Sequence, residues 1–408
     1  MVNSPVPTLA LVESPVQLLN VLEWAHAHAH TDIAHTDIAH TDIAHTDAGA
    51  AAGAPAPLLS AVPRQPGSLP GRARRPQDGP PRPDAGWLRV VVLPPTDPMS
   101  RGQLRRVAGI ARDEGHAVHW QEARGGSGSP FGALAALAPA VRRAGRIVVG
   151  DPFSRLVQLL LVPARTAELT VVDDGTATME FIAQLGRGER LRRWHRTGGG
   201  TLTRARELAY APVSGTARRR LTPRGGRVTE VFTSMPITPL PGMRLRVNDF
   251  AWTRSRFGPP RLTKGTDLVG TSLVETGVVD PARYLDAVRA LTLEHGVTRY
   301  FAHRRESPEK LRALSEATGL EIVRPDLPLE LIARRGPVGR TIVSFPSTVV
   351  HTLPYALTGT GVTVAVCDID PAWLTTAASP RARSFLAGVT ETARDVRRLP
   401  AQAAPAAG

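Results

Sequence analysis

The chain of 408 residues contains one cysteine, two lysines and few aromatic side chains. With Cys367 alone no internal disulfide can form, which favours a reducing cytoplasm as the location. An aromatic content of 5% argues against single-stranded nucleic-acid binding by base stacking. No apolar run approaches the roughly 18 residues of a membrane span, and the first residues lack the basic segment typical of a signal peptide. We therefore expect a cytoplasmic protein that contacts the inner face of a membrane only peripherally.

The basic charge is carried almost entirely by arginine, and the formal net charge is +14. Together with abundant alanine, glycine and proline, this bias is typical of a GC-rich bacterial genome, so part of the basicity is genomic. The remainder predicts attraction to anions such as nucleotide phosphates, acidic glycans, nucleic acid or an anionic membrane surface. A hydrophobic content of 42% at this length is enough for the cores of two domains.

A low-complexity stretch interrupts the first part of the chain. The pentapeptide His-Thr-Asp-Ile-Ala repeats from His30, and an Ala/Pro/Gly-rich segment follows to about residue 86. A period of five advances about 140° per repeat on a helix and alternates faces on a strand, so neither geometry aligns the histidines for a metal ion. We predict a disordered insertion over residues 26–86 and no metal site.

Outside this stretch, short β-branched runs alternate with helical patterns. Strands are predicted at residues 8–12, 87–93, 117–120, 146–150, 169–172, 228–233, 267–270, 298–302, 321–323, 340–343 and 362–367. The alternation predicts an α/β fold of two doubly wound, Rossmann-like domains that enclose a ligand cleft. The expected parts are an N-terminal domain (1–240), a linker (241–265), a C-terminal domain (266–386), and a C-terminal helix with a disordered tail (387–408). Residues 186–227 are rich in arginine and glycine with little periodicity, and no regular element is predicted before the strand at 228–233.

The most informative motif is Leu169-Thr-Val-Val-Asp173-Asp174-Gly175, in which two carboxylates end a predicted buried strand. In open α/β sheets, ligands bind beyond the carboxyl ends of such strands. Successive strand side chains point to opposite faces, so one carboxylate faces the cleft while the other fixes the turn that Gly175 permits. Which aspartate takes which role stays open, and an ordinary βα turn is the simpler alternative.

A second polar cluster, His303-Arg304-Arg305-Glu306, follows the predicted strand at 298–302. A histidine there can donate a proton near neutral pH, and two arginines can hold a phosphate or a carboxylate. The alternative is a surface turn in which the arginines pair with Glu306 and Glu309.

Two predicted helices begin with hydroxyl side chains at the end of a strand. Ser14 can cap the first of them, with Pro15 at its favoured position, and this forms an anion or substrate loop. The run Ser344-Phe-Pro-Ser347-Thr348 opens another helix, where hydroxyls and unpaired N–H groups form an anion site. A serine cap without a ligand is the alternative reading.

In their order and spacing, these motifs resemble those of the bacterial sialyltransferases, in particular the polysialyltransferase-like and lipooligosaccharide sialyltransferase-like groups. The motifs are Glu13-Ser14-Pro15-Val16-Gln17, Asp173-Asp174-Gly175, Gly270-Thr271-Ser-Leu-Val-Glu275, Tyr300-Phe-Ala-His303-Arg-Arg-Glu306 and Ser344-Phe-Pro-Ser347-Thr348. The resemblance covers most of the chain outside residues 26–86 and the C-terminal tail. It implies a two-domain GT-B glycosyltransferase that uses CMP-activated sialic acid and inverts the anomeric centre.

The resemblance also implies a role for each motif. One of Asp173 and Asp174 would deprotonate the acceptor hydroxyl, and His303 would protonate or stabilise the leaving phosphate. Ser347 and Thr348 would hold that phosphate. The other residues implied are Ser344, Arg304, Arg305, Gly270 and Thr271 on the donor side, with Ser14, Gln17 and Gly175 in acceptor-side loops. Arg304 is a departure, because the family commonly has proline after the histidine.

The expected partners are a nucleotide-sugar donor, a glycan acceptor of a capsule or surface polysaccharide, an anionic membrane surface and a second copy of the chain. No specific nucleic acid, cofactor or obligatory metal is expected beside the CMP–sialic acid substrate. Two alternatives stay open. One is another GT-B enzyme that uses or epimerises a different nucleotide sugar, and the other is an Arg-rich module that binds a polyanion.

Overall fold

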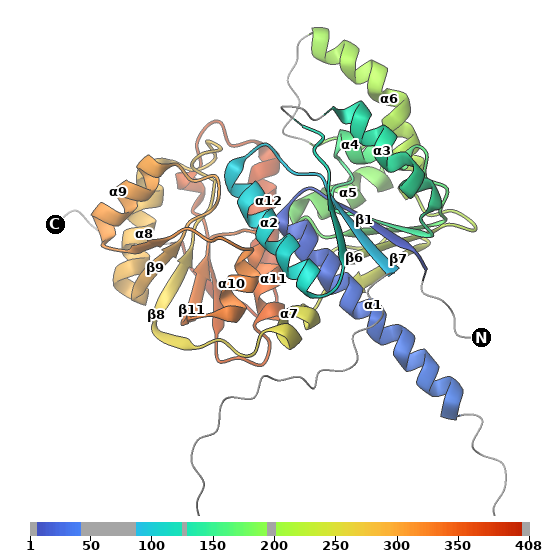
Figure 1. Ribbon diagram of the computed structural model, residues 1–408. Coiled ribbons are helices and arrows are strands. Elements are labelled where there is room, and N and C mark those ends of the chain that lie inside the picture. Colours follow the sequence, from blue (N-terminus) through green and yellow to red (C-terminus); the bar gives the residue numbers. More distant parts are fainter. Residues whose placement is uncertain (1–5, 42–86, 125–128, 194–200, 402–408) are drawn as a thin grey trace, which may run out of the picture.

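Two parallel β-sheets, each covered by helices on both faces, form two domains in the computed structural model (Figure 1), which describes residues 6–41, 87–124, 129–193 and 201–401. The strand order is β3-β2-β1-β4-β5-β6-β7 in the first sheet and β10-β9-β8-β11-β12-β13 in the second. Both orders are those of a doubly wound Rossmann sheet. The predicted fold class, a GT-B-like pair of Rossmann-like domains facing a cleft, is confirmed.

The central strands of the N-terminal sheet are buried on both faces, whereas its edge strands β3 and β7 are partly exposed. It comprises β1 (Thr8–Val12), β2 (Leu88–Val92), β3 (Ala117–Trp120), β4 (Arg146–Val149), β5 (Glu168–Val172), β6 (Val228–Thr233) and β7 (Met243–Val247). Its helices are α1 (Pro15–Thr41), α2 (Pro98–Asp113), α3 (Pro130–Arg143), α4 (Arg155–Leu161), α5 (Thr176–Gly186) and α6 (Thr201–Leu221). Every residue of β1 is buried, which is why its sequence is a continuous apolar run rather than an alternating one.

The C-terminal domain repeats this plan on a smaller scale. Its strands are β8 (Leu262–Val269), β9 (Val297–Phe301), β10 (Glu321–Val323), β11 (Val338–Ser344), β12 (Thr363–Cys367) and β13 (Arg397–Leu399). Its helices are α8 (Pro281–His295), α9 (Pro308–Thr318), α10 (Leu329–Arg335), α11 (Val349–Ala356) and α12 (Pro380–Thr392). Asp280, Ser307 and Ser379 cap α8, α9 and α12, each followed by proline at the first helical position.

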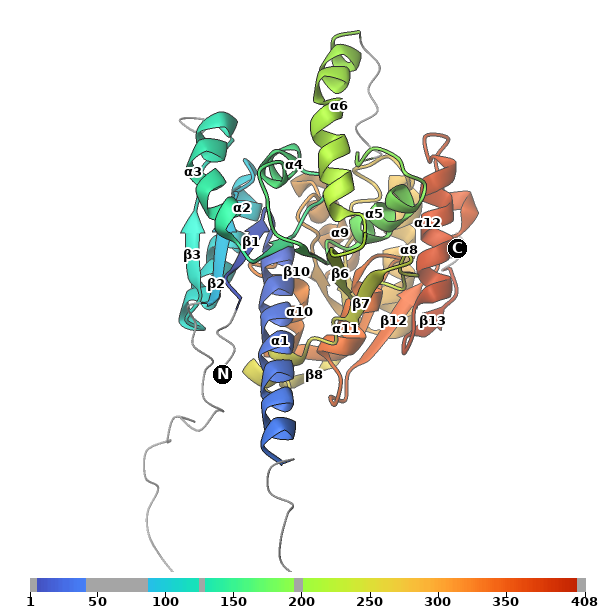
Figure 2. The same ribbon diagram turned by 90° about the vertical axis from the view of Figure 1, so that its right-hand side faces the viewer.

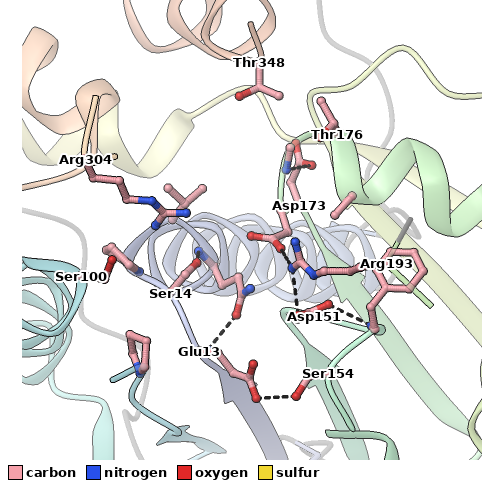
Figure 3. A pocket seen from close by; sticks show the side chains of 18 of the residues that line it. Glu13, Ser14, Ser100, Asp151, Ser154, Asp173, Thr176, Arg193, Arg304 and Thr348 are labelled. Atoms are coloured by element: carbon pink, nitrogen blue, oxygen red, sulfur yellow. Dashed lines mark hydrogen bonds and ion pairs between the residues drawn. The ribbon is translucent and has the colours of Figure 1, made fainter. Parts of the chain in front are cut away.

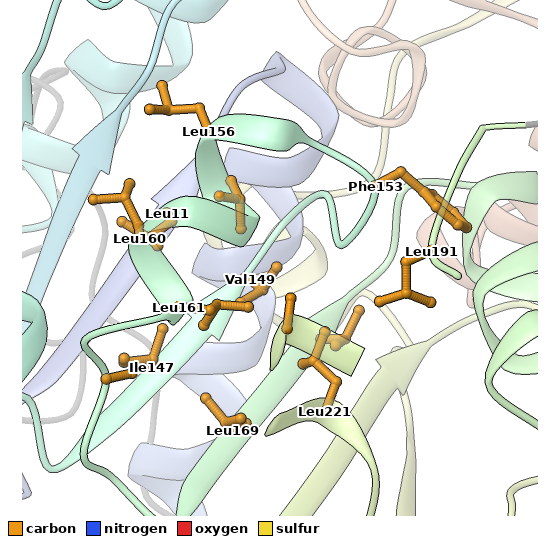
Figure 4. Close-up of a cluster of buried hydrophobic side chains, with 14 of the residues drawn as sticks. Leu11, Ile147, Val149, Phe153, Leu156, Leu160, Leu161, Leu169, Leu191 and Leu221 are labelled. Atoms are coloured by element: carbon orange, nitrogen blue, oxygen red, sulfur yellow. The ribbon is translucent and has the colours of Figure 1, made fainter. Parts of the chain in front are cut away.

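Apolar side chains fill the space on both faces of the N-terminal sheet. On the face covered by α4, Leu11, Val149 and Leu160 are fully buried and pack together (Figure 4). On the opposite face, Leu18 and Trp24 of α1 are equally buried. Burying each such side chain stabilises the fold by about 1.5–3 kcal/mol, so the two layers hold the carboxyl ends of the strands in fixed relative positions.

Several boundaries differ from the sequence prediction. The stretch 241–265, predicted as a linker, contains edge strand β7 and the first part of β8. The segment 387–408, predicted as a C-terminal helix with a disordered tail, contains the end of α12, which begins earlier, and β13, which pairs with β12; residues 402–408 lie outside the described residues. Both β7 and β13 are edge strands with exposed arginines, so they lack the continuous apolar run that identifies a central strand.

Two helices cover stretches where none was predicted. α1 continues to Thr41, so residues 26–41 are helical rather than part of a disordered insertion, and residues 42–86 lie outside the described residues. No glycine or proline interrupts the sequence from Val16 to Thr41, which allows the helix to propagate. α6 lies in the Arg-rich stretch, and the two helices extend from opposite ends of the domain (Figures 1 and 2). None of the described helices is both long and apolar enough to cross a membrane.

The short helix α7 (Ala251–Arg256) connects the domains and is fixed to α1 by the carboxylate of Glu23. The Glu23 side chain accepts hydrogen bonds from the backbone N–H groups of Trp252 (2.8 Å) and Thr253 (2.9 Å) and from the Thr253 hydroxyl. These N–H groups belong to the first turn of α7, where no helical partner exists. Burial raises the pKa of Glu23 to about 7. One buried carboxyl group therefore links α1 to the segment that connects the domains.

Replacing Glu23 by alanine leaves two buried N–H groups without an acceptor. We expect Glu23→Ala to lower the free energy of unfolding by about 1–3 kcal/mol. Urea unfolding followed by tryptophan fluorescence measures this, since Trp24 and Trp252 flank the contact. The control is Glu316→Ala, which removes an exposed carboxylate from α9. Equal effects of the two substitutions would contradict the role given to Glu23.

Candidate functional site

The carboxyl ends of both sheets open onto one cleft. The strand order reverses between β1 and β4 in the first sheet and between β8 and β11 in the second, and ligands of such sheets bind at these reversals. The cavity there has a volume of about 1460 Å³ and is lined by both domains, which is room for a nucleotide sugar. The sequence-predicted residues that line it are Ser14, Gln17, Asp173, Asp174, Gly175, Gly270, Thr271, His303, Arg304, Arg305, Ser347 and Thr348.

Asp173 is the aspartate that fixes the turn after β5. Its side chain is buried, and its Oδ1 accepts hydrogen bonds from the Gly175 N–H (3.0 Å) and the Thr178 hydroxyl (2.7 Å). Its Oδ2 accepts from the Ser234 N–H at the end of β6 (3.3 Å). Burial raises the pKa of Asp173 to about 6, although these donors oppose the shift. With both oxygens engaged, Asp173 is a structural residue.

Asp174 is the aspartate available to a ligand. Its side chain remains 16% exposed, and its Oδ2 accepts a hydrogen bond from Nη2 of Arg193 (2.8 Å). The same Arg193 nitrogen also bonds Oδ2 of Asp151 (2.9 Å) at the end of β4. Burial, followed by the nearby Asp151 carboxylate, raises the pKa of Asp174 to about 7. A carboxylate with this pKa is suited to accept a proton near neutral pH.

The sequence analysis missed a second group of charged residues around Asp174. Figure 3 shows Arg193 beside Asp151, and Glu13 bonded to Ser154 at the ends of β1 and β4. The Ser154 hydroxyl donates to Oε1 of Glu13 (2.6 Å), and Arg124 forms an ion pair with the same carboxylate. Glu13 and Asp151 each follow a predicted strand directly, as the Asp173-Asp174 pair does. This position in the sequence could have identified them as site residues. Among the described side chains, no three acids, histidines or cysteines are grouped so that they could hold a metal ion.

Ser14 and Gln17 hold the loop between β1 and α1. Ser14 caps α1 as predicted, because its hydroxyl accepts from the Gln17 N–H (3.2 Å). The Gln17 side chain is buried, and its Oε1 accepts a hydrogen bond from the Glu13 N–H (2.7 Å). A methyl group at Gly150 would lie 2.4 Å from this amide oxygen, so glycine is required there. Gln17 therefore fixes the loop between β1 and α1.

On the opposite side of the cleft, His303 follows β9. Its Nδ1 accepts a hydrogen bond from the Arg305 N–H (3.2 Å), so the proton of the neutral ring is on Nε2. Burial, then the charges of Arg304, Arg305 and Lys310, lower the pKa of His303 to about 4. His303 is therefore a neutral hydrogen-bond donor in the free protein. A bound phosphate would offset the neighbouring cations and raise its pKa.

Glu306 holds the loop that carries His303. Its buried carboxylate accepts from the His303 N–H and from the Tyr300 hydroxyl, and it forms an ion pair with Lys310 (2.7 Å). The alternative of a surface turn with Glu306 paired to arginine is thus wrong, since the partner is lysine. A methyl group at Gly270 would lie 2.3 Å from Oε2 of Glu306, which explains why the end of β8 carries glycine.

The hydroxyl cluster after β11 has one buried and two accessible members. Ser344 is 1% exposed and does not line the cavity; its hydroxyl bonds the Phe345 carbonyl (2.7 Å) and the Ser347 hydroxyl (3.0 Å). Ser344 is therefore a supporting residue rather than a ligand contact. Ser347 and Thr348 precede α11 and line the cavity, and the Thr348 hydroxyl makes no cap bond to the helix. Hydroxyl groups that line a cavity at a helix N-terminus can bind an anion.

No protein-family model and no curated protein sequence matches the chain. Among solved structures, the chain is similar to an alpha/beta-galactoside alpha-2,3-sialyltransferase from the luminous marine bacterium Photobacterium phosphoreum. The TM-score is 0.48 at 8% identity, covering 96% of this chain and 98% of that chain. It is also similar to a variant of Os79 from O. sativa in complex with UDP, with a TM-score of 0.35 at 14% identity, covering 75% and 88% of the two chains.

The electrostatic surroundings of His303 predict its response to a phosphate ligand. We expect its ring to titrate near pH 4 in the free protein, and CMP to raise that pKa, because a phosphate reduces the repulsion from Arg304, Arg305 and Lys310. Histidine NMR titration with and without CMP measures both values, with His303→Gln to assign the signal. Exposed His119 lies outside the cavity lining and should not respond to CMP. An unchanged His303 signal at saturating CMP would contradict its placement at the phosphate.

Proposed function

We propose that the protein is an inverting glycosyltransferase that transfers sialic acid from CMP–sialic acid to a glycan hydroxyl. One observation carries the proposal: a carboxylate with a pKa near 7, Asp174, faces a cluster of cations and hydroxyls across the cleft. That cluster contains His303, Arg304, Arg305, Ser347 and Thr348, which suits a leaving phosphate. The similarity of the sequence motifs to those of bacterial sialyltransferases supports the same donor.

In this mechanism Asp174 is the general base. Its carboxylate takes the proton of the acceptor hydroxyl while that oxygen bonds the anomeric carbon of the donor. The bond from that carbon to the phosphate oxygen breaks, and CMP leaves with the electron pair. A single displacement of this kind inverts the anomeric centre and needs no covalent enzyme intermediate. General-base assistance contributes roughly 10²- to 10⁴-fold to the rate.

The C-terminal domain stabilises the departing CMP. The Nε2–H of His303 donates a hydrogen bond to the phosphate, and the Ser347 and Thr348 hydroxyls bind it at the start of α11. As the bond breaks, negative charge develops on the phosphate oxygen, and the hydrogen bond that the neutral His303 ring donates to it becomes stronger. Glu306 does not contact the phosphate in this mechanism, but it positions His303 by accepting a hydrogen bond from its backbone N–H.

The nucleotide can be tested without knowing the acceptor. A ligand that binds only the folded state raises the melting temperature, so we expect CMP to raise it more than CDP, UDP or GDP. A shift with UDP and none with CMP would favour a GT-B enzyme with another nucleotide sugar. No shift with any nucleotide, together with stabilisation by heparin, would favour the Arg-rich polyanion-binding alternative.

The two aspartates are expected to respond differently to the same substitution. Asp174→Asn should lower kcat of transfer from CMP–sialic acid by about 10²- to 10⁴-fold and preserve the CMP-induced shift. Asp173→Asn should instead lower the melting temperature, because its new NH₂ group faces N–H and hydroxyl donors. Asp113→Asn, on the exposed end of α2, is the control. Full transfer activity in Asp174→Asn would reject Asp174 as the base.

The raised pKa of Asp174 also predicts how transfer depends on pH. The base acts only when deprotonated, so kcat should rise tenfold per pH unit below pH 7 and level off above it. A rate profile between pH 5 and pH 9 at saturating donor measures this, with melting temperatures recorded at each pH. In Asp174→Asn, the residual rate should lose this rise. A profile that falls from pH 6 to pH 8 would contradict a base with this pKa.

A further inference from the structure

Arg304 is a cation in the cleft without a bonding partner. Its side chain is exposed to the cavity, and among the described residues its guanidinium makes no hydrogen bond or ion pair. Arg124 and Arg193, which line the same cavity, each bond carboxylates of the N-terminal domain. The five N–H donors of this guanidinium therefore have no acceptor among the described residues. An arginine in this situation is suited to bind an anion supplied by a ligand.

Arg304 extends from the loop after β9 across the cleft toward the N-terminal domain. It follows His303 in the chain but extends toward the N-terminal domain, on the side where Ser14 and Ser100 line the cavity, whereas Thr348 lies above the Asp173 turn (Figure 3). It interacts electrostatically with Asp174 and Asp97 across the cleft. Arg304 thus lies in the cleft between His303, on the side proposed for the leaving group, and Asp174, the proposed base.

The chemistry of the donor supplies an anion at this place. In the proposed reaction the anomeric carbon lies between Asp174, which directs the acceptor oxygen, and the phosphate at His303 and Thr348. In CMP–sialic acid that carbon also carries a carboxylate, which projects to the side of the line joining the attacking and leaving oxygens. A planar guanidinium can bind a carboxylate with two parallel hydrogen bonds. Donors with neutral sugars have no group to pair with it.

We propose that the guanidinium of Arg304 binds the carboxylate on the anomeric carbon of the donor sugar and so selects sugar acids over neutral sugars. The inference rests on the proposed function and adds a specificity-determining residue to it. Arg304 contacts the sugar, while His303, Ser347 and Thr348 contact the phosphate. The proline that the family commonly has after the histidine cannot make this contact, since its ring carries no donor.

The test combines a substitution of Arg304 with esterification of the donor carboxylate and compares the binding affinities of the four combinations. Calorimetric titration gives the affinities of wild type and Arg304→Gln for CMP, for CMP–3-fluoro-sialic acid, which resists transfer, and for the methyl ester of the latter. In wild type, esterification should weaken binding by about 10- to 100-fold, the worth of a charged hydrogen-bonded contact. In Arg304→Gln the acid and the ester should bind equally, with CMP affinity changed less than threefold. Arg304→Lys should recover only part of the preference.

Two matched variants separate this contact from a general loss of charge. Arg305→Gln removes the neighbouring cation, and should weaken CMP and the fluorinated donor by the same factor. Arg312→Gln, exposed on α9, should change neither. Equal weakening of CMP and the donor by Arg304→Gln would make Arg304 a phosphate ligand and overturn the inference, as would an unchanged preference for acid over ester. Wild-type protein that binds none of the three ligands would instead overturn the proposed function itself.

Discussion

The buried carboxylate of Asp173 is the interaction on which the geometry of the site depends. It ties the end of β5 to α5 through Thr178 and to the end of β6 through Ser234. The Asp173 carbonyl accepts from Asn20 of α1 (2.8 Å), and Asn20 in turn accepts from Asn248 after β7 (2.9 Å). One turn therefore joins three strand ends and two helices. Because both Asp173 oxygens are engaged inward, the next residue, Asp174, is left facing the cleft.

The two walls of the cleft differ in how their charges are balanced. On the N-terminal side, the carboxylates of Glu13, Asp151 and Asp174 are paired with Arg124 and Arg193. On the C-terminal side, Lys310 is paired with Glu306 and Glu275, whereas Arg304 has no such partner among the described residues. The raised pKa of Asp174 and the lowered pKa of His303 both arise from burial reinforced by like charges. An anionic ligand would offset the excess positive charge around His303 and Arg304, and would leave the ion pairs of the N-terminal side unchanged.

How far the sequence predicts this structure depends on where each residue lies. Central strands such as β1 and β5 are buried on both faces, so their apolar runs were sufficient to predict them and the carboxylates that follow. Edge strands β7 and β13 carry exposed arginines and were missed. The choice between Asp173 and Asp174 could not be made either. It is decided by Thr178, Ser234 and Arg193, whose proximity arises only when separate strand ends meet.

The sequence also could not predict where the two domains come into contact. Gly175 has a positive φ of 67°, which its turn requires, but the structure gives a second reason for glycine. A methyl group there would lie 2.8 Å from Cγ2 of Thr348 in the opposite domain. Gly175, which follows Asp174, thus lies against Thr348, which precedes α11, with no side chain of its own between them. In the proposed mechanism, the base Asp174 and the phosphate site at Thr348 therefore lie on two domains that are in contact at Gly175, so the catalytic arrangement depends on this approach of the domains.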